Sequence, residues 1–268
     1  MKLLRPACLA FVFLLGICGT SERSMATGEQ TQNGGQSEQT FEKEIAKTVC
    51  LRYLLYLPKG YGEDKDKRWP LILFLHGAGE RGSNLDAVKT HGPPKLVEQG
   101  KDFPFVIVSP QCPSETWWTE RLDALTAMLD DVESKYAVDH NRVYLTGLSM
   151  GGFGSWSLAC EYPDRFAAVV PICGGGDPRD VGRIRDIPIW VFHGGKDPTV
   201  PVQRSREMVD ALRKMGGRVR YTEYPDVGHG SWVPAYATEE LYEWMLQQRR
   251  ARPQQPRATQ PHSDGPEG

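Results

Sequence analysis

The sequence has no excess of charge of either sign. Its 32 lysines and arginines are balanced by 34 aspartates and glutamates, which gives a formal net charge of −2 over 268 residues. No basic stripe is visible, and a basic stripe is the usual electrostatic mark of a nucleic-acid binder. The charge balance therefore argues against a nucleic-acid partner, while 40% hydrophobic content is enough for a buried core.

The chain also lacks a hydrophobic run long enough for a stable membrane span, which needs about 20 residues. Its N-terminal apolar stretch covers only residues 9–17, follows the basic start at residues 1–5 and precedes Gly19, Thr20 and Ser21. A basic segment, a short apolar segment and small residues in this order are typical of a cleaved signal peptide. We therefore expect residues 1–21 to direct export, to a periplasm or to the outside of the cell.

Cysteines are few, and none has the spacing of a zinc site. Cys18 follows Ile17, which is bulkier than the residue that usually precedes a lipidated cysteine, so lipid anchoring through Cys18 is the less favoured alternative. Beyond the signal peptide four cysteines remain: Cys50, Cys112, Cys160 and Cys173. Oxidation after export would allow three full pairings, among which the sequence does not choose.

Two biased segments flank one domain at residues 40–248. Residues 22–39 are rich in Ser, Thr, Gln, Glu and Gly, and residues 249–268 in Pro, Gln and Arg, so we expect a disordered linker and a disordered tail. Strand-type apolar runs in the domain cover residues 49–57, 71–75, 105–109, 143–146, 168–173, 189–193 and 218–224. Helical patterns cover residues 122–136, 152–161, 202–215 and 238–247, with a poorer helix at 84–100 that Pro93-Pro94 interrupts.

Strands that alternate with helices predict an α/β fold with a mainly parallel, doubly wound sheet. Several of the runs are continuously apolar, as expected for strands that are covered on both faces. Sites in such sheets form beyond the carboxyl ends of the strands. Residues 174–188 are too few for a helical lid between two of these strands, so we expect an open groove without a large lid domain.

The segment Gly147-Leu148-Ser149-Met150-Gly151 joins a strand-type run to a helical pattern. Gly-x-Ser-x-Gly at such a junction predicts a nucleophile elbow, a tight turn that lifts the serine hydroxyl off the sheet beside a helix N-terminus. The glycines permit the close backbone approach that this turn needs. Ser149 is therefore the candidate nucleophile.

A serine hydroxyl needs an imidazole base, and the base needs a carboxylate that orients it. Asp197 follows the run at 189–193 and His229 follows the run at 218–224, which gives the α/β-hydrolase order Ser, Asp, His. Asp226 is the alternative acid, but it lies in the same loop as His229 and is expected not to reach across to the ring. The alternative bases are His76, His91, which has no role that the sequence assigns, and His193, which we expect to hydrogen-bond locally.

Hydrolysis of an acyl group also needs donors for the oxyanion. The first expected donor is the N–H of Met150, directly after the candidate nucleophile. The second is expected from Ala78 or Gly77, in the glycine-rich segment 76–82 that follows the strand at 71–75. The alternative, a phosphate-binding loop, is disfavoured because the segment has neither the GxGxxG nor the GxxxxGK spacing.

Four motifs occur in order: His-Gly-Ala-Gly-Glu-Arg-Gly at 76–82, Gly-Leu-Ser-Met-Gly-Gly at 147–152, His-Gly-Gly-Lys-Asp at 193–197 and Gly-His at 228–229. Together they resemble the α/β-hydrolase superfamily over residues 40–248. The sequence is most similar to bacterial carboxylesterases of the dienelactone-hydrolase and polyhydroxybutyrate-depolymerase-like group, which includes feruloyl and acetyl-xylan esterases. The resemblance implies ester hydrolysis through an acyl-enzyme on Ser149, Asp197 and His229, with Met150 in the oxyanion hole and no cofactor or metal.

Aromatic and polar side chains are expected at the rim of the site. Gln111 and the pair Trp117-Trp118 follow the strand at 105–109, and Trp232 follows His229. Aromatic faces bind aromatic acyl groups or stack on sugar rings, so Trp118, Trp232 and Gln111 are the candidate substrate-binding residues. The alternative is that one or two of the tryptophans only pack the loops. Glu80 and Arg81 are expected to pair with each other.

The favoured function is an exported serine carboxylic-ester hydrolase for short-chain or aromatic esters, such as feruloyl or acetyl groups, on small molecules or polysaccharide branches. A serine peptidase of prolyl-oligopeptidase type is one alternative, disfavoured because no propeller domain or amine-anchoring acidic pair precedes the catalytic domain. A catalytically silent binding relative is the other, disfavoured by the intact set of Ser149, Asp197 and His229. The natural ester, its acyl length and the oligomeric state stay open.

Overall fold

The computed structural model describes Thr40 and residues 48–250 of the chain. It divides into two units, Met1–Ala46 and Lys47–Gly268, and the fold described below belongs to the second. The expected signal peptide at 1–21 and linker at 22–39 lie outside the described residues, as does the expected tail apart from Arg249 and Arg250. Among the helices in the described part, none is long and apolar enough to cross a membrane.

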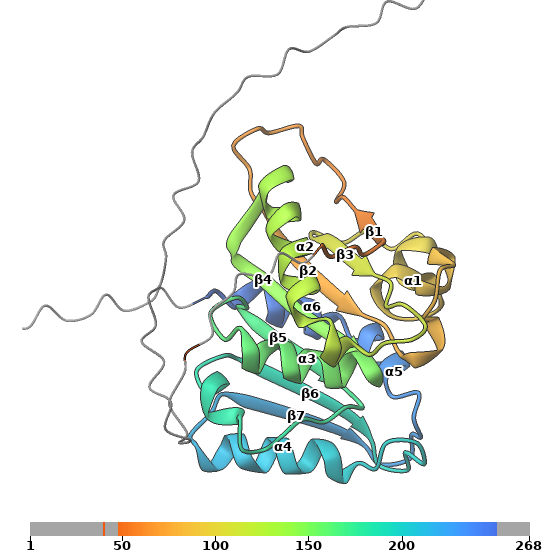
Figure 1. Ribbon diagram of the computed structural model, residues 1–268, viewed down its shortest axis with the longest axis vertical. Coiled ribbons are helices and arrows are strands. Elements are labelled where there is room, and N and C mark those ends of the chain that lie inside the picture. Colours follow the sequence, from red (N-terminus) through yellow and green to blue (C-terminus); the bar gives the residue numbers. More distant parts are fainter. Residues whose placement is uncertain (1–39, 41–47, 251–268) are drawn as a thin grey trace, which may run out of the picture. The chain divides into compact units, whose positions relative to one another are not determined.

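The core of the second unit is a seven-stranded sheet with the order β1-β3-β2-β4-β5-β6-β7 (Figure 1). Only β1 is antiparallel to its neighbour, and the other pairs are parallel. The strands are β1 (Tyr53–Tyr56), β2 (Trp69–Leu75), β3 (Val106–Pro110), β4 (Val138–Leu148), β5 (Ala168–Ile172), β6 (Ile189–Gly194) and β7 (Val219–Tyr224). The mainly parallel α/β sheet is thus confirmed, and each strand overlaps one of the predicted runs.

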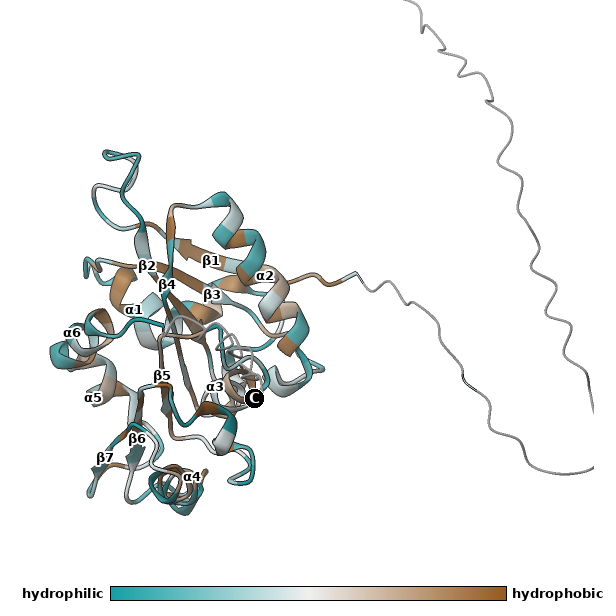
Figure 2. Cartoon of the chain, turned by 90° about the vertical axis from the view of Figure 1, so that its left-hand side faces the viewer, coloured by the Kyte–Doolittle hydropathy of each residue, from teal (hydrophilic) through white to brown (hydrophobic). Residues whose placement is uncertain are grey.

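Helices cover both faces of this sheet (Figure 2). They are α1 (Gly92–Glu98), α2 (Leu122–Lys135), α3 (Met150–Glu161), α4 (Gln203–Lys214), α5 (Trp232–Ala237) and α6 (Glu239–Gln247), with short 3₁₀ helices η1 (Ala78–Glu80), η2 (Leu85–Thr90), η3 (Trp118–Glu120) and η4 (Val181–Ile184). Residues of α2, α3 and α4 belong to one buried cluster, and residues of α1, α5 and α6 to the other. Between β5 and β6 the only helix is η4, which confirms that no large lid is inserted there in the described chain.

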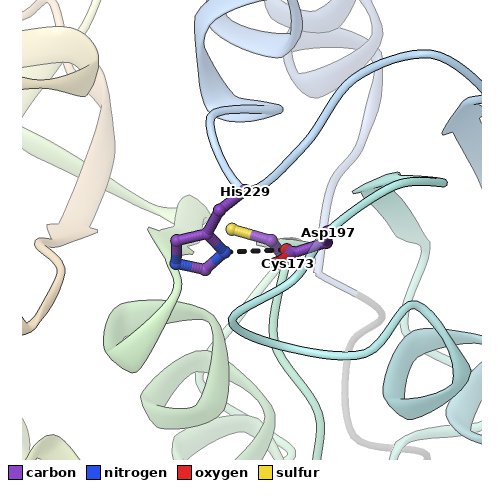
Figure 3. A group of neighbouring side chains, drawn as sticks. All are labelled: Cys173, Asp197 and His229. Carbon is purple, nitrogen blue, oxygen red and sulfur yellow. Dashed lines mark hydrogen bonds and ion pairs between the residues drawn. The ribbon is translucent and has the colours of Figure 1, made fainter.

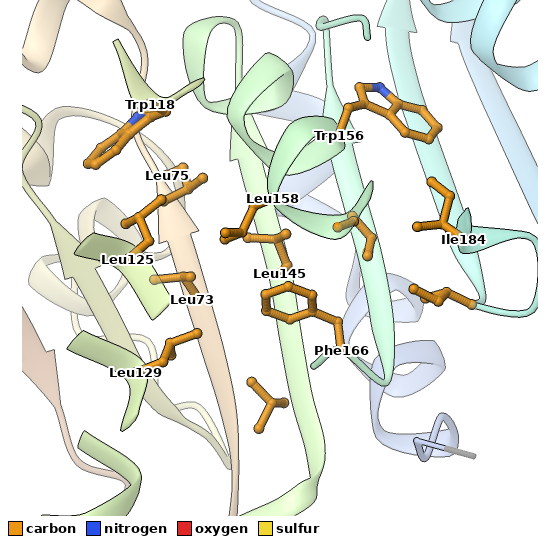
Figure 4. Packing of buried hydrophobic residues seen from close by; sticks show 14 of the residues in the cluster. Leu73, Leu75, Trp118, Leu125, Leu129, Leu145, Trp156, Leu158, Phe166 and Ile184 are labelled. Carbon is orange, nitrogen blue, oxygen red and sulfur yellow. The ribbon is translucent and has the colours of Figure 1, made fainter. Parts of the chain in front are cut away.

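Every residue of β2 is buried, and its side chains alternate between the two apolar clusters. Leu71, Leu73 and Leu75 join the cluster under α2 and α3, whereas Ile72 and Phe74 join the opposite cluster. Successive strand side chains point to opposite faces, so a central strand that is covered on both sides must be apolar throughout. Figure 4 shows the α2 and α3 side of this packing, with Trp118 and Trp156 among its largest members.

Two local predictions were wrong. Pro93 and Pro94 do not interrupt a helix but begin one, because they occupy the first turn of α1, where no intrahelical N–H donor is needed. The segment before them forms the separate helix η2. Helix α5 was not predicted at all, since it is a single short element that contains Pro234. It begins three residues after His229 and therefore bears on the site.

The glycines of the elbow allow strand and helix backbones to meet. A Cβ atom added at Gly151 would overlap the carbonyl oxygen of Leu75, and one at Gly152 would lie 2.5 Å from the carbonyl oxygen of Ile172. Both contacts are with backbone, which cannot move aside as a flexible side chain can. The elbow is therefore pressed directly against the ends of β2 and β5.

We expect Gly151→Ala to lower the free energy of unfolding by about 3 kcal/mol or more, because the new methyl group meets a fixed strand carbonyl. Urea unfolding followed by circular dichroism measures the change. Gly182→Ala is the matched control, since its Cβ would meet only the Met215 side chain at 3.7 Å and beyond. Equal stability of the two variants would contradict the close-approach argument.

Candidate active site

Ser149, Asp197 and His229 meet at the carboxyl ends of β4, β6 and β7. His229 Nε2 lies 2.9 Å from Ser149 Oγ, and His229 Nδ1 lies 2.7 Å from Asp197 Oδ2. Because a carboxylate only accepts, Nδ1–H is the donor to Asp197, which leaves Nε2 as the acceptor for the serine hydroxyl. The three side chains thus have the geometry of a nucleophile, a base and an orienting acid.

Ser149 is held in a strained turn between β4 and α3. Its backbone has φ 52° and ψ −116°, a region that non-glycine residues seldom adopt. The Ser149 N–H donates to the Ile172 carbonyl at 2.9 Å, and the Ser149 carbonyl accepts from Phe153 N–H at 3.0 Å. Strain of this kind persists only when the surroundings fix it, and it is common at functional sites.

Asp197 is a buried acceptor. Its side chain has no exposed surface, and its Oδ1 accepts from the N–H groups of Thr199 and Val200, both at 2.9 Å. Burial acts to raise the pKa of Asp197, but the hydrogen bonds from His229, Val200 and Thr199 outweigh it and hold the pKa below its ordinary value. Asp197 is therefore ionised at neutral pH and able to orient the imidazole.

The alternative residues do not take part in the row of hydrogen bonds to Ser149, although His193 Nε2 also lies 3.3 Å from Asp197 Oδ2. Asp226 is 87% exposed at its side chain and pairs with Lys196 at 2.6 Å, away from the ring of His229. His193 is buried and hydrogen-bonds to the Ser205 hydroxyl and to the Val200 carbonyl, which confirms the expected local role. Among the described residues, His229 is the histidine that contacts Ser149.

The expected oxyanion loop packs against the elbow. Gly77 caps η1, Ala78 is its first residue, and Met150 is the first residue of α3. A Cβ on Gly77 would lie 2.8 Å from Leu148 Cδ1, so the loop runs directly beside the residue that precedes Ser149. In the described part of the chain, the N–H groups of Ala78 and Met150 donate to no backbone carbonyl outside their own helices. Both N–H groups therefore stay candidates for the oxyanion hole.

The side chain of His76 holds this loop in place through two hydrogen bonds. Its Nδ1–H donates to the Gly77 carbonyl at 2.6 Å, and its Nε2 accepts from Cys112 N–H at 3.0 Å, so the ring is neutral. Burial lowers the pKa of His76 to about 4. The fully buried Trp118 adds a hydrogen bond from its Nε1–H to the His76 carbonyl at 2.9 Å.

This burial predicts a pH dependence of stability. Between the ordinary pKa of 6.5 and the folded-state pKa of about 4, the unfolded chain takes up a proton that the folded protein does not. The stability is fully present above the upper value and falls by about 3 kcal/mol as the pH drops through this window. His76→Gln should reduce that slope in urea unfolding, with the remainder due to the buried His193 and to His91, whereas the exposed control His140→Gln should keep the full slope. A slope unchanged by His76→Gln would assign the effect to other histidines, such as the buried His193.

Two of the three predicted substrate-binding residues, Trp118 and Gln111, are buried. Trp118 is 0% exposed and lies beneath the loop rather than at the rim, where its neighbour Trp117 is 47% exposed. Gln111 is buried, and its Nε2–H₂ donates to the carbonyls of Glu80 and Asn84. Neither residue lies at an exposed rim as expected, because a sequence does not show which side of a loop faces solvent, although Trp118 does line the cavity beside Met150. Gln111 and Trp118 instead hold the loop that carries Ala78.

Trp232 lies against the candidate base, with its ring centroid 5.1 Å from that of His229 in an edge-on arrangement. Trp232 also packs against His91, with 5.1 Å between the ring centroids. The expected pair of Glu80 and Arg81 does not form, because Arg81 lies over the Trp117 ring at 4.7 Å. The Glu80 carboxylate lies 3.8 Å from both His76 Nδ1 and His91 Nε2. His91 and Trp117 are neighbours of the site that the sequence reasoning did not assign.

An apolar cavity of about 240 Å³ opens beside Met150, the first expected oxyanion donor. Its walls are Trp117, Thr119, Met150 and Phe153, with Trp118 beneath. A cavity of this composition suits a small apolar or aromatic group.

Cys173, Asp197 and His229 bring a sulfur, a carboxylate oxygen and an imidazole nitrogen within 4.8 Å of one another (Figure 3). These residue types can bind a metal, but burial raises the pKa of the Cys173 thiol to about 12, so without a metal the thiol is protonated at neutral pH. Both ring nitrogens of His229 are also already hydrogen-bonded, to Asp197 and to Ser149. The group fits an acid–base pair better than a metal site.

The four described cysteines are all free, and Cys112, Cys160 and Cys173 are buried.

Comparison with known proteins agrees with this geometry. Residues 110–242 match the dienelactone hydrolase family. The chain is 28% identical over 200 residues to a probable feruloyl esterase C of Aspergillus terreus, covering 72% of this chain and 73% of that protein. It is 29% identical over 141 residues to a bifunctional acetylxylan esterase/xylanase of Neocallimastix patriciarum, covering 50% of this chain and 20% of that protein.

Among solved structures, a thermostable esterase is 40% identical to this chain, with a TM-score of 0.65. The match covers 75% of this chain and 60% of the esterase, so the chain spans less than two thirds of that protein. The motifs, the sheet order and these matches together place the chain in the dienelactone hydrolase family of α/β-hydrolases, as a hydrolase of the carboxylesterase type.

Proposed function

We propose that the protein is an exported serine esterase that cleaves short-chain and aromatic esters, acetyl and feruloyl esters among them, including ester branches of polysaccharides. The observation that carries this proposal is the hydrogen-bonded row Ser149, His229 and Asp197 beside an apolar cavity. The names of the relatives, a probable feruloyl esterase and an acetylxylan esterase/xylanase, support the two acyl classes.

The geometry supports a two-step reaction. Ser149 Oγ attacks the ester carbonyl carbon while His229 Nε2 takes the hydroxyl proton, and the N–H groups of Met150 and of Ala78 or Gly77 stabilise the oxyanion. Collapse of the tetrahedral intermediate breaks the bond to the alcohol oxygen, which leaves with the proton from His229. Water, deprotonated by His229, then attacks the acyl-enzyme, releases the carboxylic acid and restores Ser149.

The cavity beside Met150 supports the choice of acyl group. Its volume of about 240 Å³ and its walls of Trp117, Met150 and Phe153 suit an acetyl group or a single aromatic ring. Export is proposed from the N-terminal sequence pattern alone, and N-terminal sequencing of the secreted protein would test it.

A substrate panel tests the activity: p-nitrophenyl acetate to decanoate, methyl ferulate, acetylated xylan and an aminoacyl anilide, each with the full chain. We expect hydrolysis of acetate and ferulate and little of the decanoate or the anilide. Preferred cleavage of the anilide would support the peptidase alternative instead. A folded protein that hydrolyses none of them would overturn the proposal in favour of a binding role.

A further inference from the structure

A second cavity, of about 180 Å³, is lined by Trp232 and by other residues of the α1 and α5 segments. Its lining includes His91, Lys95 and Gln99 from the α1 segment and Trp232, Val233 and Tyr236 from α5. Trp232 packs on both His229 and His91, each with 5.1 Å between ring centroids, so it connects this cavity to the candidate base. The first cavity adjoins Met150 instead, so the two cavities border different members of the site.

The two cavities are placed to receive different parts of an ester substrate. In ester hydrolysis the base returns its proton to the leaving alcohol oxygen, so the alcohol part must lie on the base's side of the serine. The acyl carbonyl must lie at the oxyanion donors. The cavity beside Trp232 is thus placed for the alcohol part, and the one beside Met150 for the acyl part.

Lys95 gives the second cavity its charge. The lysines nearest to it in the sequence are paired: Lys89 with Asp86 and Glu98, and Lys101 with Glu239. Lys95 is exposed at the cavity, and within the described residues no carboxylate lies within 4.0 Å of its ammonium group.

The surroundings of Lys95 combine an apolar wall with polar groups. Trp232 and the 62% exposed Val233 supply apolar surface, and Gln99 adds an amide. Glu80 is the carboxylate nearest to His91, but its side chain is only 10% exposed. A ring could pack on the apolar wall while a negatively charged substituent meets Lys95.

We propose that this cavity is the subsite for the alcohol part of the ester, and that it selects alcohols whose ring carries a carboxylate. The inference rests on the proposed esterase function and names its substrate class. Two kinds of alcohol share this chemistry, a hydroxylated aromatic acid and a uronic-acid sugar.

A matched pair of substrates tests the charge preference. 4-Acetoxybenzoate and methyl 4-acetoxybenzoate share the acetyl group and differ in whether the alcohol part is charged. In Lys95→Gln the ratio of kcat/KM for the charged over the neutral ester should fall about fivefold, and in Lys95→Glu about tenfold or more. Lys65→Gln, which removes an exposed lysine outside the cavity, is the control and should leave the ratio unchanged.

The same ratio measured with acetylated methyl galacturonoside and acetylated methyl galactoside separates the two sources. A Lys95-dependent ratio in either arm supports the subsite and tells which ring it takes. A ratio that Lys95→Gln and Lys95→Glu leave unchanged in both arms, with wild-type turnover intact, overturns the subsite. Absence of wild-type turnover on all four esters and on p-nitrophenyl acetate would instead overturn the proposed function.

Discussion

Ser149→Ala should lower kcat/KM for p-nitrophenyl acetate by about 10⁴-fold or more, because the variant loses the hydroxyl that the candidate base contacts. In the described chain, His229 Nε2 has Ser149 Oγ as its hydrogen-bond partner at 2.9 Å. The fold should survive, since alanine removes only one oxygen and the glycines that allow the turn stay in place. A stopped assay of the purified variant measures the loss of activity, and its unfolding curve shows whether the fold is intact.

Ser157→Ala is the matched control for that variant. Ser157 is a partly exposed serine of the same helix α3, two turns from Ser149, and it has no contact with His229 in the described structure. It should keep the wild-type rate. Full activity in Ser149→Ala, or an equal loss in Ser157→Ala, would show that the strained elbow does not carry the nucleophile.

Much of the fold was predictable because its signals are local. The runs that form β2 and β5 are apolar along their whole length, as central strands must be when helices cover both faces of a sheet. The elbow was predictable for a similar reason. At Gly147, Gly151 and Gly152 a side chain would collide with backbone atoms. The glycines in the motif therefore indicate the tight turn directly.

The orientation of side chains in loops was not predictable. Trp117 and Trp118 are adjacent in the sequence, yet one is 47% exposed and the other fully buried. The difference depends on the hydrogen bond of Trp118 Nε1–H to the His76 carbonyl, a contact across 42 positions of sequence. Gln111 shows the same limit, because its partners Glu80 and Asn84 belong to a loop that the β2–β3 pairing brings next to it.

The two flanks of the site are linked through the loop that follows β2. Glu80 lies near His76, which fastens the oxyanion segment, and also near His91, which packs on Trp232. Trp232 in turn packs on His229. The acyl side and the proposed alcohol side therefore share one buried carboxylate, and substitutions of Glu80 are expected to affect both.

Asp197→Asn should lower kcat/KM by about 10⁴-fold while leaving the loop intact. The amide oxygen can still accept from Thr199 and Val200 N–H, which preserves the turn. The amide NH₂ would then face His229 Nδ1 and donate to it, which moves the ring proton to Nε2. An imidazole protonated at Nε2 cannot take the proton of Ser149, so acylation should fail although the ring stays in place.

Asp226→Asn is the comparison that decides between the two acids that the sequence offered. Asp226 is exposed and pairs only with Lys196 among the described residues, so its amide variant should keep the wild-type rate and stability. If Asp226→Asn lost as much activity as Asp197→Asn, the hydrogen bond at 2.7 Å between Asp197 and His229 would not be the orienting contact. The expected contrast arises from burial: the carboxylate that orients the base is the one that water does not reach.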